Sequence, residues 1–295
     1  MTSFSEFLDE LLPSVEATLD ALLPAPSRDP ARLHRAMRYS VFAGGKRVRP
    51  TLVVLAGESY GARRVDLLPA AASMEMIHTF TLIHDDLPAL DADDLRRGRP
   101  TLHREFDEAL AILAGDALLN RGLLCLAREP DAVDSSRRVA AVEVAAAAVA
   151  AMIAGQVGDI EAEANWPEHP ETALVEIHRR KTGALLTACL RLGGVYAGVG
   201  DSEDRLLREI GEGIGLLFQI GDDILDVVGS ADALGKTAGK DADSKKLTYP
   251  ALFGVAESRR RLGAERDRTL ELCARLPRKG EIFESLVRYL CDRDR

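Results

Sequence analysis

Residues 84–103 read HDDLPALDADDLRRGRPTLH, and the fold of this 295-residue chain can be inferred outward from them. Asp85 and Asp86 end an apolar stretch, residues 67–86, that has helical periodicity. Pro88 cannot continue that helix, so we expect the chain to bend and to bring Asp91 back from a loop. The segment therefore predicts three carboxylates gathered at the end of one helix.

A second acidic cluster, GDDILDVVG, occupies residues 221–229. Asp222 and Asp226 are four residues apart and share one helical face with Gln219, one turn earlier. A solvated acidic helix is the simpler interpretation, but apolar residues surround these carboxylates: Phe218, Ile220, Ile224, Leu225, Val227 and Val228. Crowded carboxylates repel one another unless a cation neutralises them. Because Mg²⁺ is commonly bound by one or two carboxylates plus phosphate oxygens, the two clusters predict a magnesium-diphosphate site.

Basic residues follow both clusters and recur elsewhere in the chain. They are Arg96 and Arg97, Lys181 in the segment Lys181-Thr182-Gly183, and Lys236, Lys240, Lys245 and Lys246. Another group, FAGGKRVRP, occupies residues 42–50, where paired glycines allow the backbone to approach a ligand closely. Arginine binds phosphate oxygens through a planar fork of donors and lysine supplies a mobile point charge, so these residues suit diphosphate ligands.

The first cluster is compatible in part with two other kinds of metal site. A calcium loop that begins at Asp91 fails, because its sixth position is Arg96 instead of glycine and its twelfth is not glutamate. A phosphohydrolase that binds metal through His84 and Asp85 needs further histidines from other helices. The chain offers only His34, His78, His103, His169 and His178, so this alternative stays open.

The rest of the chain predicts an all-α protein in one domain, residues 1–295. Aromatic residues make up 5% of the sequence while Ala and Leu abound, which favours helices over strands. No Pro/Ser/Gly-rich boundary divides the chain, and Pro13 is expected to kink or interrupt the first helix. Helical patterning covers 4–23, 31–43, 51–60, 67–86, 105–128, 134–164, 171–190, 203–228 and 248–275.

The charge and composition of the chain indicate which ligands and which cellular location it is suited to. The net charge of −9 argues against nucleic acid, which requires a basic face. The apolar run from Val139 to Gly155 falls short of the roughly 20 residues of a membrane span and is interpreted as a central buried helix. Gln156 and Asp159 at its end either reach the site or cap the helix into solvent. Four separated cysteines and an acidic N-terminus without an export signal favour a cytoplasmic protein without stable membrane insertion.

Taken together, the two acidic segments resemble the aspartate-rich motifs of trans-isoprenyl diphosphate synthases. The resemblance spans nearly the whole chain, because FAGGKRVRP, KTG at 181–183, FQIGDD at 218–223, LGK at 234–236 and KKLTYP at 245–250 follow in the family's order. The six-residue step from Asp85 to Asp91 is similar to that of bacterial farnesyl diphosphate synthases (geranyltranstransferases). This resemblance implies an isoprenoid synthase fold, a single large helical bundle around a deep central cavity, and a homodimer.

The resemblance also assigns site residues. It implies that Mg²⁺ is held by Asp85, Asp91 and Asp222, with Asp86 and Asp226 in support. The diphosphate of an allylic substrate would be bound by Arg96, Lys181, Gln219, Lys236 and Lys246, and that of isopentenyl diphosphate by Lys46, Arg49, His78 and Arg97. The carbonyl of Lys181 and the side chains of Thr182 and Gln219 would lie near the developing allylic cation, which makes these three the catalytic candidates.

Product length depends on the residues that precede Asp85 on its helix. Thr81 lies one turn before Asp85, and Phe80 lies beside that face, where similar synthases use an aromatic side chain to close the pocket after three isoprene units. We therefore expect farnesyl diphosphate, with geranylgeranyl diphosphate as the alternative. A terpene cyclase would not need Lys46, Arg49 and His78, and a noncatalytic subunit would have lost catalytic Asp or Lys residues.

Overall fold

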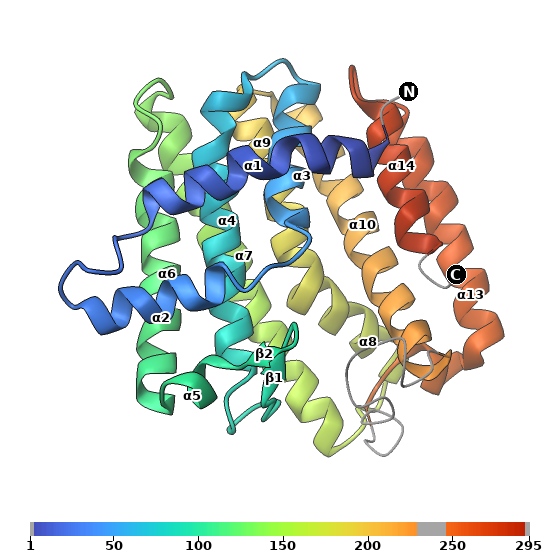
Figure 1. Ribbon diagram of the computed structural model, residues 1–295. Coiled ribbons are helices and arrows are strands. Elements are labelled where there is room, and N and C mark those ends of the chain that lie inside the picture. Colours follow the sequence, from blue (N-terminus) through green and yellow to red (C-terminus); the bar gives the residue numbers. More distant parts are fainter. Residues whose placement is uncertain (1–2, 229–245, 293–295) are drawn as a thin grey trace.

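The computed structural model describes residues 3–228 and 246–292, which are mostly helical (Figure 1). The all-α prediction is confirmed. The helices are α1 (Phe4–Leu22), α2 (Ala31–Val41), α3 (Val48–Ser59), α4 (Arg64–Asp85), α5 (Leu102–Glu105), α6 (Glu108–Arg128), α7 (Ser135–Ala164), α8 (Pro170–His178), the π-helix η1 (Arg179–Gly183), α9 (Ala184–Ala197), α10 (Asp201–Val228), α13 (Tyr249–Cys273) and α14 (Gly280–Cys291). Two short strands, β1 (Leu95–Arg96) and β2 (Arg99–Pro100), form an antiparallel hairpin.

Helix α4 is the central element of the bundle. It packs against α1, α3, α6 and α9, and its side chains Leu67, Met74 and Ile77 are fully buried. Helix α10 packs on the other side of α9, against α13, α14 and η1. Where α3 meets α9, a Cβ atom at Gly193 would lie 2.5 Å from the carbonyl oxygen of Val53, so this glycine permits a close helix contact.

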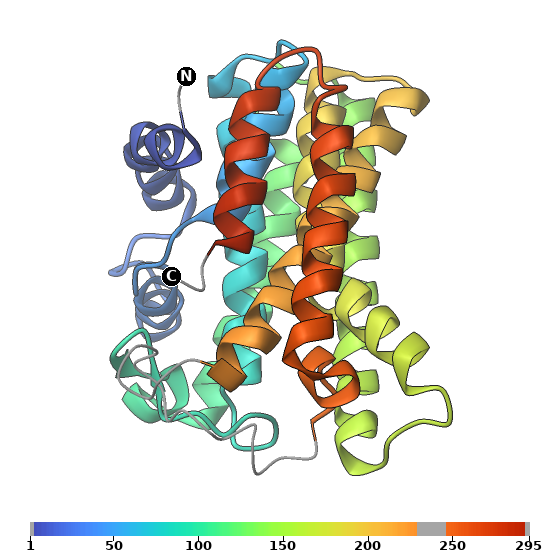
Figure 2. The ribbon, with the colours of Figure 1, turned by 90° about the vertical axis from the view of Figure 1, so that its right-hand side faces the viewer.

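The direction of the helices places both acidic segments at the same end of the bundle. Helices α4 and α10 both run downward in Figure 1, and their C-terminal ends lie near the hairpin and the start of α13 in both views (Figures 1 and 2). Helix α7 also ends there, and α8 begins there. The fold therefore collects the termini of four helices around the candidate site.

The structure differs from one local prediction and adds two elements that were not predicted. Helix α1 continues through Pro13. Proline has no N–H to donate to the carbonyl of Asp9, but both residues are exposed, so water can bind that carbonyl instead. Helix α14 was not predicted, although Ile282, Phe283 and Leu286 form a buried apolar stripe. The hairpin was not predicted either, because strands of two residues are too short to show alternation.

Helix α7 is not a central buried helix, contrary to the prediction. Its buried face packs against α6, α9 and η1, while apolar side chains on the opposite face, among them Val139, Ile153 and Val157, are about half exposed. By length and composition alone, α6 and α7 are both long and apolar enough to cross a membrane. The four cysteines are free thiols, as the sequence predicted.

Candidate active site

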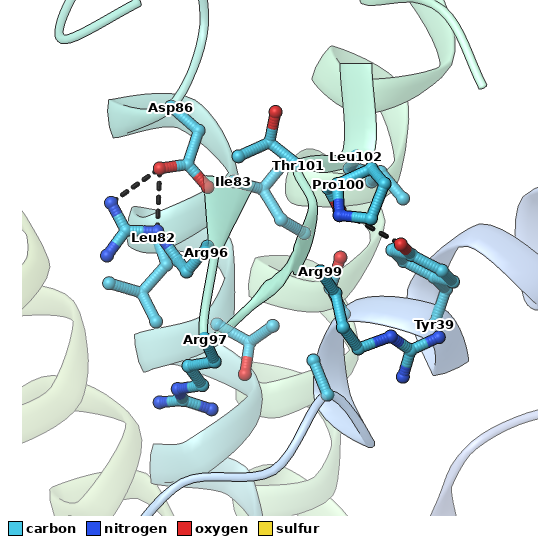
Figure 3. Close-up of a pocket in the computed structure, with 13 residues that line it drawn as sticks. Tyr39, Leu82, Ile83, Asp86, Arg96, Arg97, Arg99, Pro100, Thr101 and Leu102 are labelled. Atoms are coloured by element: carbon cyan, nitrogen blue, oxygen red, sulfur yellow. Dashed lines mark hydrogen bonds and ion pairs between the residues drawn. The ribbon is translucent and has the colours of Figure 1, made fainter. Parts of the chain in front are cut away.

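The first acidic segment ends α4 as predicted. The backbone N–H of Asp91 donates to the carbonyl of Asp85 over 2.9 Å, so the turn after Pro88 returns the chain to the helix end. Asp86 is buried and accepts hydrogen bonds from Arg96, whose Nε lies 2.6 Å from its Oδ1 (Figure 3). Arg96, expected to bind the allylic diphosphate, is thus ion-paired with Asp86 and is held beside Asp85.

Burial dominates the electrostatics of Asp85. Burial raises the pKa of Asp85 to about 6, Lys181 opposes this rise, and the neighbouring Asp91 adds to it. Burial likewise raises the pKa of Asp86, against the opposing effect of Arg96. A cation bound at this helix end would restore the charged form of Asp85, which is the behaviour expected of a metal ligand.

The three carboxylates of the second acidic segment differ in burial and in hydrogen bonding. Asp222 and Gln219 are half-buried near the end of α10, and Asp226 is exposed. Asp223 is buried and accepts a hydrogen bond of 2.9 Å from the backbone N–H of Tyr249, in the first turn of α13. Burial raises the pKa of Asp223 to about 7; the hydrogen bond from Tyr249 opposes this rise, and Asp222 adds to it. Asp223 therefore ties α10 to α13.

Two glycines bring the Lys181-Thr182-Gly183 segment between α7 and α10. A Cβ atom at Gly155 of α7 would overlap the backbone nitrogen of Lys181, and one at Gly215 of α10 would lie 2.7 Å from the Cα of Gly183. The segment forms the π-helix η1 between α8 and α9. Single π-helical turns within α-helices are frequent at functional sites. Close backbone contact on both sides therefore fixes the position of Lys181 and Thr182.

The charge of Lys181 acts on Asp85 of the first acidic segment and on His178, which lies beside Asp223 of the second. Nζ of Lys181 lies 2.5 Å from Oδ2 of Asp159, so Asp159 reaches the site instead of capping α7 into solvent. Next to it, His178 is buried, stacks on the ring of Tyr249 and lies 3.8 Å from Asp223. Burial lowers the pKa of His178 to about 4, with Asp159 opposing and Lys181 and Lys246 assisting, so this imidazole is neutral near pH 7. Lys246 thus belongs to the same group, whereas Lys236 lies outside the described residues.

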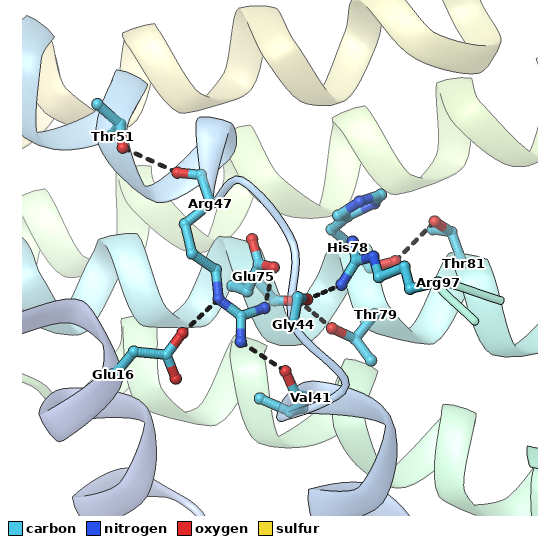
Figure 4. A network of polar contacts seen from close by, with 10 residues as sticks. All are labelled: Glu16, Val41, Gly44, Arg47, Thr51, Glu75, His78, Thr79, Thr81 and Arg97. Carbon is cyan, nitrogen blue, oxygen red and sulfur yellow. Dashed lines mark hydrogen bonds and ion pairs between the residues drawn. The ribbon is translucent and has the colours of Figure 1, made fainter. Parts of the chain in front are cut away.

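The expected isopentenyl diphosphate residues form a second cationic group. Arg49 and His78 come from α3 and α4, and Arg97, from the hairpin turn, donates to the carbonyl of Gly44 (Figure 4). Burial lowers the pKa of His78 well below its usual value, and Arg49 and Arg97 lower it further. The buried Nε of Arg49 and Nδ1 of His78 have no hydrogen-bond partner among the described residues, so both atoms are available to pair with a bound ligand.

Lys46 lies at the exposed edge of this group. Its ammonium donates to the hydroxyl of Tyr289 over 2.6 Å and lies over the same ring. Tyr289 belongs to α14, so a helix that was not predicted supplies a contact at the candidate site. Binding of a diphosphate by Lys46 requires this contact to be shared or exchanged.

Arg96 and Arg97 also border a small hollow between α2, α4 and the hairpin (Figure 3). The hydroxyl of Tyr39 donates to the carbonyl of Pro100 over 2.9 Å, and the Arg99 guanidinium lies 4.4 Å from the centre of the Tyr39 ring. These contacts anchor the hairpin to α2. They hold both arginines against the end of α4.

The donor chemistry suits Mg²⁺, although the protein side chains alone do not form a complete site. Within residues 3–228 and 246–292, no three His, Cys, Asp or Glu side chains lie close enough to hold a metal ion together. Magnesium prefers oxygen ligands and completes its coordination with water and phosphate oxygens. Burial of Asp85 beside another carboxylate is compatible with this ion, so magnesium binding by Asp85, Asp91 and Asp222 stays a prediction.

An all-α bundle that carries aspartate-rich segments at one end is the architecture of the isoprenoid synthases. The chain belongs to the polyprenyl synthetase family, which matches residues 30–290. The members of this family are trans-prenyltransferases that join isopentenyl diphosphate to an allylic diphosphate.

The relatives carry different product names. A heterodimeric geranylgeranyl pyrophosphate synthase large subunit of Arabidopsis thaliana is 47% identical over 260 residues, which are 86% of this chain and 70% of that protein. A farnesyl diphosphate synthase of Geobacillus stearothermophilus is 39% identical over 293 residues, 98% of this chain and 96% of that protein. The solved structure of an FPP/GFPP synthase of Zymomonas mobilis superposes with a TM-score of 0.87 at 30% identity, covering 98% of each chain.

Proposed function

We propose that this protein condenses isopentenyl diphosphate with dimethylallyl or geranyl diphosphate to give farnesyl diphosphate, with Mg²⁺ as the cofactor. The observation that carries the proposal is that two separate sets of basic side chains lie toward one end of the bundle. One set lies with the acidic helix ends and includes Lys181, and the other contains the unpaired Arg49 and the neutral His78. Two sites for two diphosphates are what a condensing enzyme needs.

The residues have distinct tasks in this reaction. Asp85, Asp91 and Asp222 would hold Mg²⁺, which when bound neutralises the charge that develops on the leaving diphosphate. Arg96, Lys181 and Lys246 hold that diphosphate while the allylic carbon–oxygen bond breaks. The double bond of isopentenyl diphosphate, anchored by Lys46, Arg49, His78 and Arg97, then attacks the allylic cation. The departed diphosphate accepts the final proton, and Lys181, Thr182 and Gln219 stabilise the cation through their oxygen atoms.

Incubation with labelled isopentenyl diphosphate and either allylic primer, followed by chromatography, tests this proposal. We expect magnesium-dependent release of diphosphate only with both substrates, and farnesyl diphosphate as the main product. Release from one allylic substrate alone would identify a terpene cyclase instead. Hydrolysis of simple phosphate esters that depends on His84 would identify a phosphohydrolase.

Geranylgeranyl diphosphate is the second candidate product, because the relatives include synthases of that name at 42–47% identity. Support for farnesyl diphosphate comes from Phe80, which is buried on α4 and meets the ring of His84 edge-on at 4.9 Å. His84 in turn occupies the space that a side chain at position 115 would need, since Gly115 faces its ring. This aromatic pair adds bulk on the side of α4 that faces α6.

A homodimer is the assembly we propose, because α6 and α7 leave apolar side chains exposed. Ile112 and Leu113 of α6 and Ile153, Val157 and Ile160 of α7 are between 45% and 58% exposed. Sedimentation analysis of the wild type and of an Ile153→Glu, Val157→Glu variant tests this, with a dimer and a monomer expected respectively. A wild-type monomer, or one that associates only with a different subunit, would contradict it.

We also propose that the whole chain acts as one domain in the cytoplasm without stable membrane insertion. Its net charge of −9, together with the basic residues Lys46, Arg49, Arg96, Arg97 and Lys181 at the candidate site, favours small anionic substrates over nucleic acid. Cell fractionation tests the location, and retention in the membrane fraction at high salt would contradict it. Limited proteolysis tests the proposal of a single domain: we expect no stable fragment, and a stable fragment would contradict it.

A further inference from the structure

A buried ion pair lies behind the second cationic group and takes no part in the roles assigned so far. Glu75 of α4 and Arg47, which precedes α3, have side chains that are 3% and 1% exposed. Nη1 of Arg47 lies 2.6 Å from Oε1 of Glu75 (Figure 4). A buried carboxylate and a buried guanidinium are both costly to desolvate, so each depends on the other.

The Arg47 side chain joins three parts of the fold. Besides Glu75, it donates from Nε to Glu16 of α1 over 2.7 Å and from Nη2 to the carbonyl of Val41 at the end of α2 over 2.6 Å. Each of the three guanidinium nitrogens therefore donates to a protein oxygen, and the side chain is buried away from the surface. Arg47 is a structural anchor, unlike Arg49 two residues later.

The backbone at Arg47 explains why an anchor is needed. Arg47 has φ 49° and ψ 36°, a left-handed conformation that is unfavourable for a residue with a side chain, and Gly44 and Gly45 also have positive φ. Its carbonyl accepts a hydrogen bond from the hydroxyl of Thr51 and so caps the first turn of α3. This turn sends the Arg47 side chain into the core and leaves Lys46 exposed.

The same loop determines where the ligand-binding cations lie. Arg97 donates to the carbonyl of Gly44, and a Cβ atom at Gly45 would lie 2.5 Å from its guanidinium carbon. Arg49 lies in the first turn of α3, which Arg47 precedes, and its buried Nε has no hydrogen-bond partner among the described residues. The position of both arginines therefore depends on the conformation of residues 44–47.

Glu75 also supplies the negative charge that this region needs. It lies one turn before His78 on α4, and its charge acts on Arg47, Arg49 and Arg97. Among these arginines, only Arg47 forms a direct ion pair with it. Glu75 thus stabilises the cationic group while leaving Arg49 without a direct ion-pair partner.

We propose that Glu75, acting through Arg47, is a positioning residue for the isopentenyl diphosphate site. It holds the 44–47 loop so that Lys46, Arg49 and Arg97 converge on that diphosphate, and it has no role at the allylic site. The proposal rests on the function proposed above, because that function assigns the second cationic group to isopentenyl diphosphate.

Glu75→Gln tests the proposal, because it keeps the shape of the side chain and removes its charge. We expect the KM for isopentenyl diphosphate to rise about 10- to 100-fold, the scale of one charged hydrogen bond, while the KM for the allylic substrate changes less than about twofold. Calorimetric titration of isopentenyl diphosphate should show the same weakening without turnover. An unchanged affinity in a folded variant, or equal losses for both substrates, would overturn the proposal.

Glu58→Gln is the matched control. Glu58 of α3 pairs with Arg64 of α4 over 2.6 Å, so the control makes the same chemical change between the same two helices at their far end. Its KM for isopentenyl diphosphate should stay at the wild-type value. A rise equal to that of Glu75→Gln would show that general loosening of α3 and α4 is responsible.

A double variant, Arg47→Met with Glu75→Leu, keeps the test valid if Glu75→Gln does not fold. Replacing a whole buried ion pair by apolar side chains of similar size is often neutral for stability. We expect this variant to fold and to bind isopentenyl diphosphate more weakly than the wild type does. A variant with wild-type affinity would overturn the proposal. If the wild type does not condense the two substrates, the proposed function is refuted. Titration with isopentenyl diphosphate requires no turnover, so it still shows whether Glu75 affects binding of that ligand.

Discussion

Replacement of Gly155 by alanine tests how the Lys181-Thr182-Gly183 segment is held. The new Cβ atom would overlap the backbone nitrogen of Lys181 and lie 2.8 Å from both the carbonyl carbon and the Cβ of Arg180. These are mostly backbone atoms, which cannot rotate away, so η1 must move relative to α7. Such overpacking costs about 1–3 kcal/mol, and the higher helix propensity of alanine returns about 1 kcal/mol. The net loss of stability is therefore small, about 0–2 kcal/mol.

Turnover should respond more strongly than stability. A displacement of Lys181 and Thr182 by a fraction of an ångström misplaces the groups proposed to meet the leaving diphosphate and the cation. We expect kcat to fall about 10- to 100-fold, because misplacement of this size at a reacting centre has effects of that order. Steady-state kinetics with geranyl diphosphate and urea unfolding measure the two quantities on the same preparation.

Gly158→Ala provides the control one turn further along α7. A Cβ atom there would lie 3.4 Å from the side chain of Ile177, so alanine fits, and the variant should keep its activity and gain up to about 1 kcal/mol. Equal kcat values for the Gly155 and Gly158 variants would refute the account of how η1 is positioned.

Three further predictions concern the acidic segments and the product. Asp85→Ala or Asp222→Ala should lower turnover about a thousandfold or more with unchanged circular dichroism, and unaltered turnover in either variant would remove that residue from the site. Phe80→Ala should shift products toward longer chains, whereas Phe106→Ala, which removes an aromatic contact with Tyr39 of α2 instead of one with His84 of α4, should not; the same product distribution in both variants would exclude Phe80 as the pocket floor. Because burial raises the pKa of Asp223 from 3.8 to about 7, the folded, metal-free protein retains a proton that the unfolded chain releases. The stability contributed by this proton is complete below about pH 4 and is lost as the pH rises through 7, so urea unfolding in EDTA should show a weaker pH dependence for Asp223→Asn than for the wild type.

The motif spacing predicted the first helix end correctly because local rules determine it. Pro88 stops the helix, and the hydrogen bond from Asp91 to Asp85 closes the turn within seven residues. The fold class followed equally from long helical periodicity. These features depend on residues that are close together in the sequence, so they can be predicted from one sequence alone.

Contacts between distant segments were not predictable in the same way. Asp222 and Asp223 are adjacent and chemically identical, yet only the packing of α13 shows that Asp223 binds the backbone of Tyr249. Likewise, Arg47 and Arg49 occur in one basic segment, and the left-handed turn at Arg47 decides which of them points into the core.

Helix α14 had a detectable signal, since its apolar residues recur at helical spacing after Gly280. By contrast, the composition of α7 misled the prediction. Its many apolar residues indicate burial, but only one face packs within the chain, and the other is exposed. Composition does not show which face of an apolar helix packs within its own chain.

A crystal structure with Mn²⁺ and a non-hydrolysable allylic diphosphate analogue tests the central claim most directly, since the anomalous signal locates the metal. The account predicts metal ions bound to Asp85, Asp91 and Asp222, with the analogue's diphosphate held between the ends of α4 and α10. Metal ions at only one of these helix ends, or a diphosphate bound elsewhere, would contradict it.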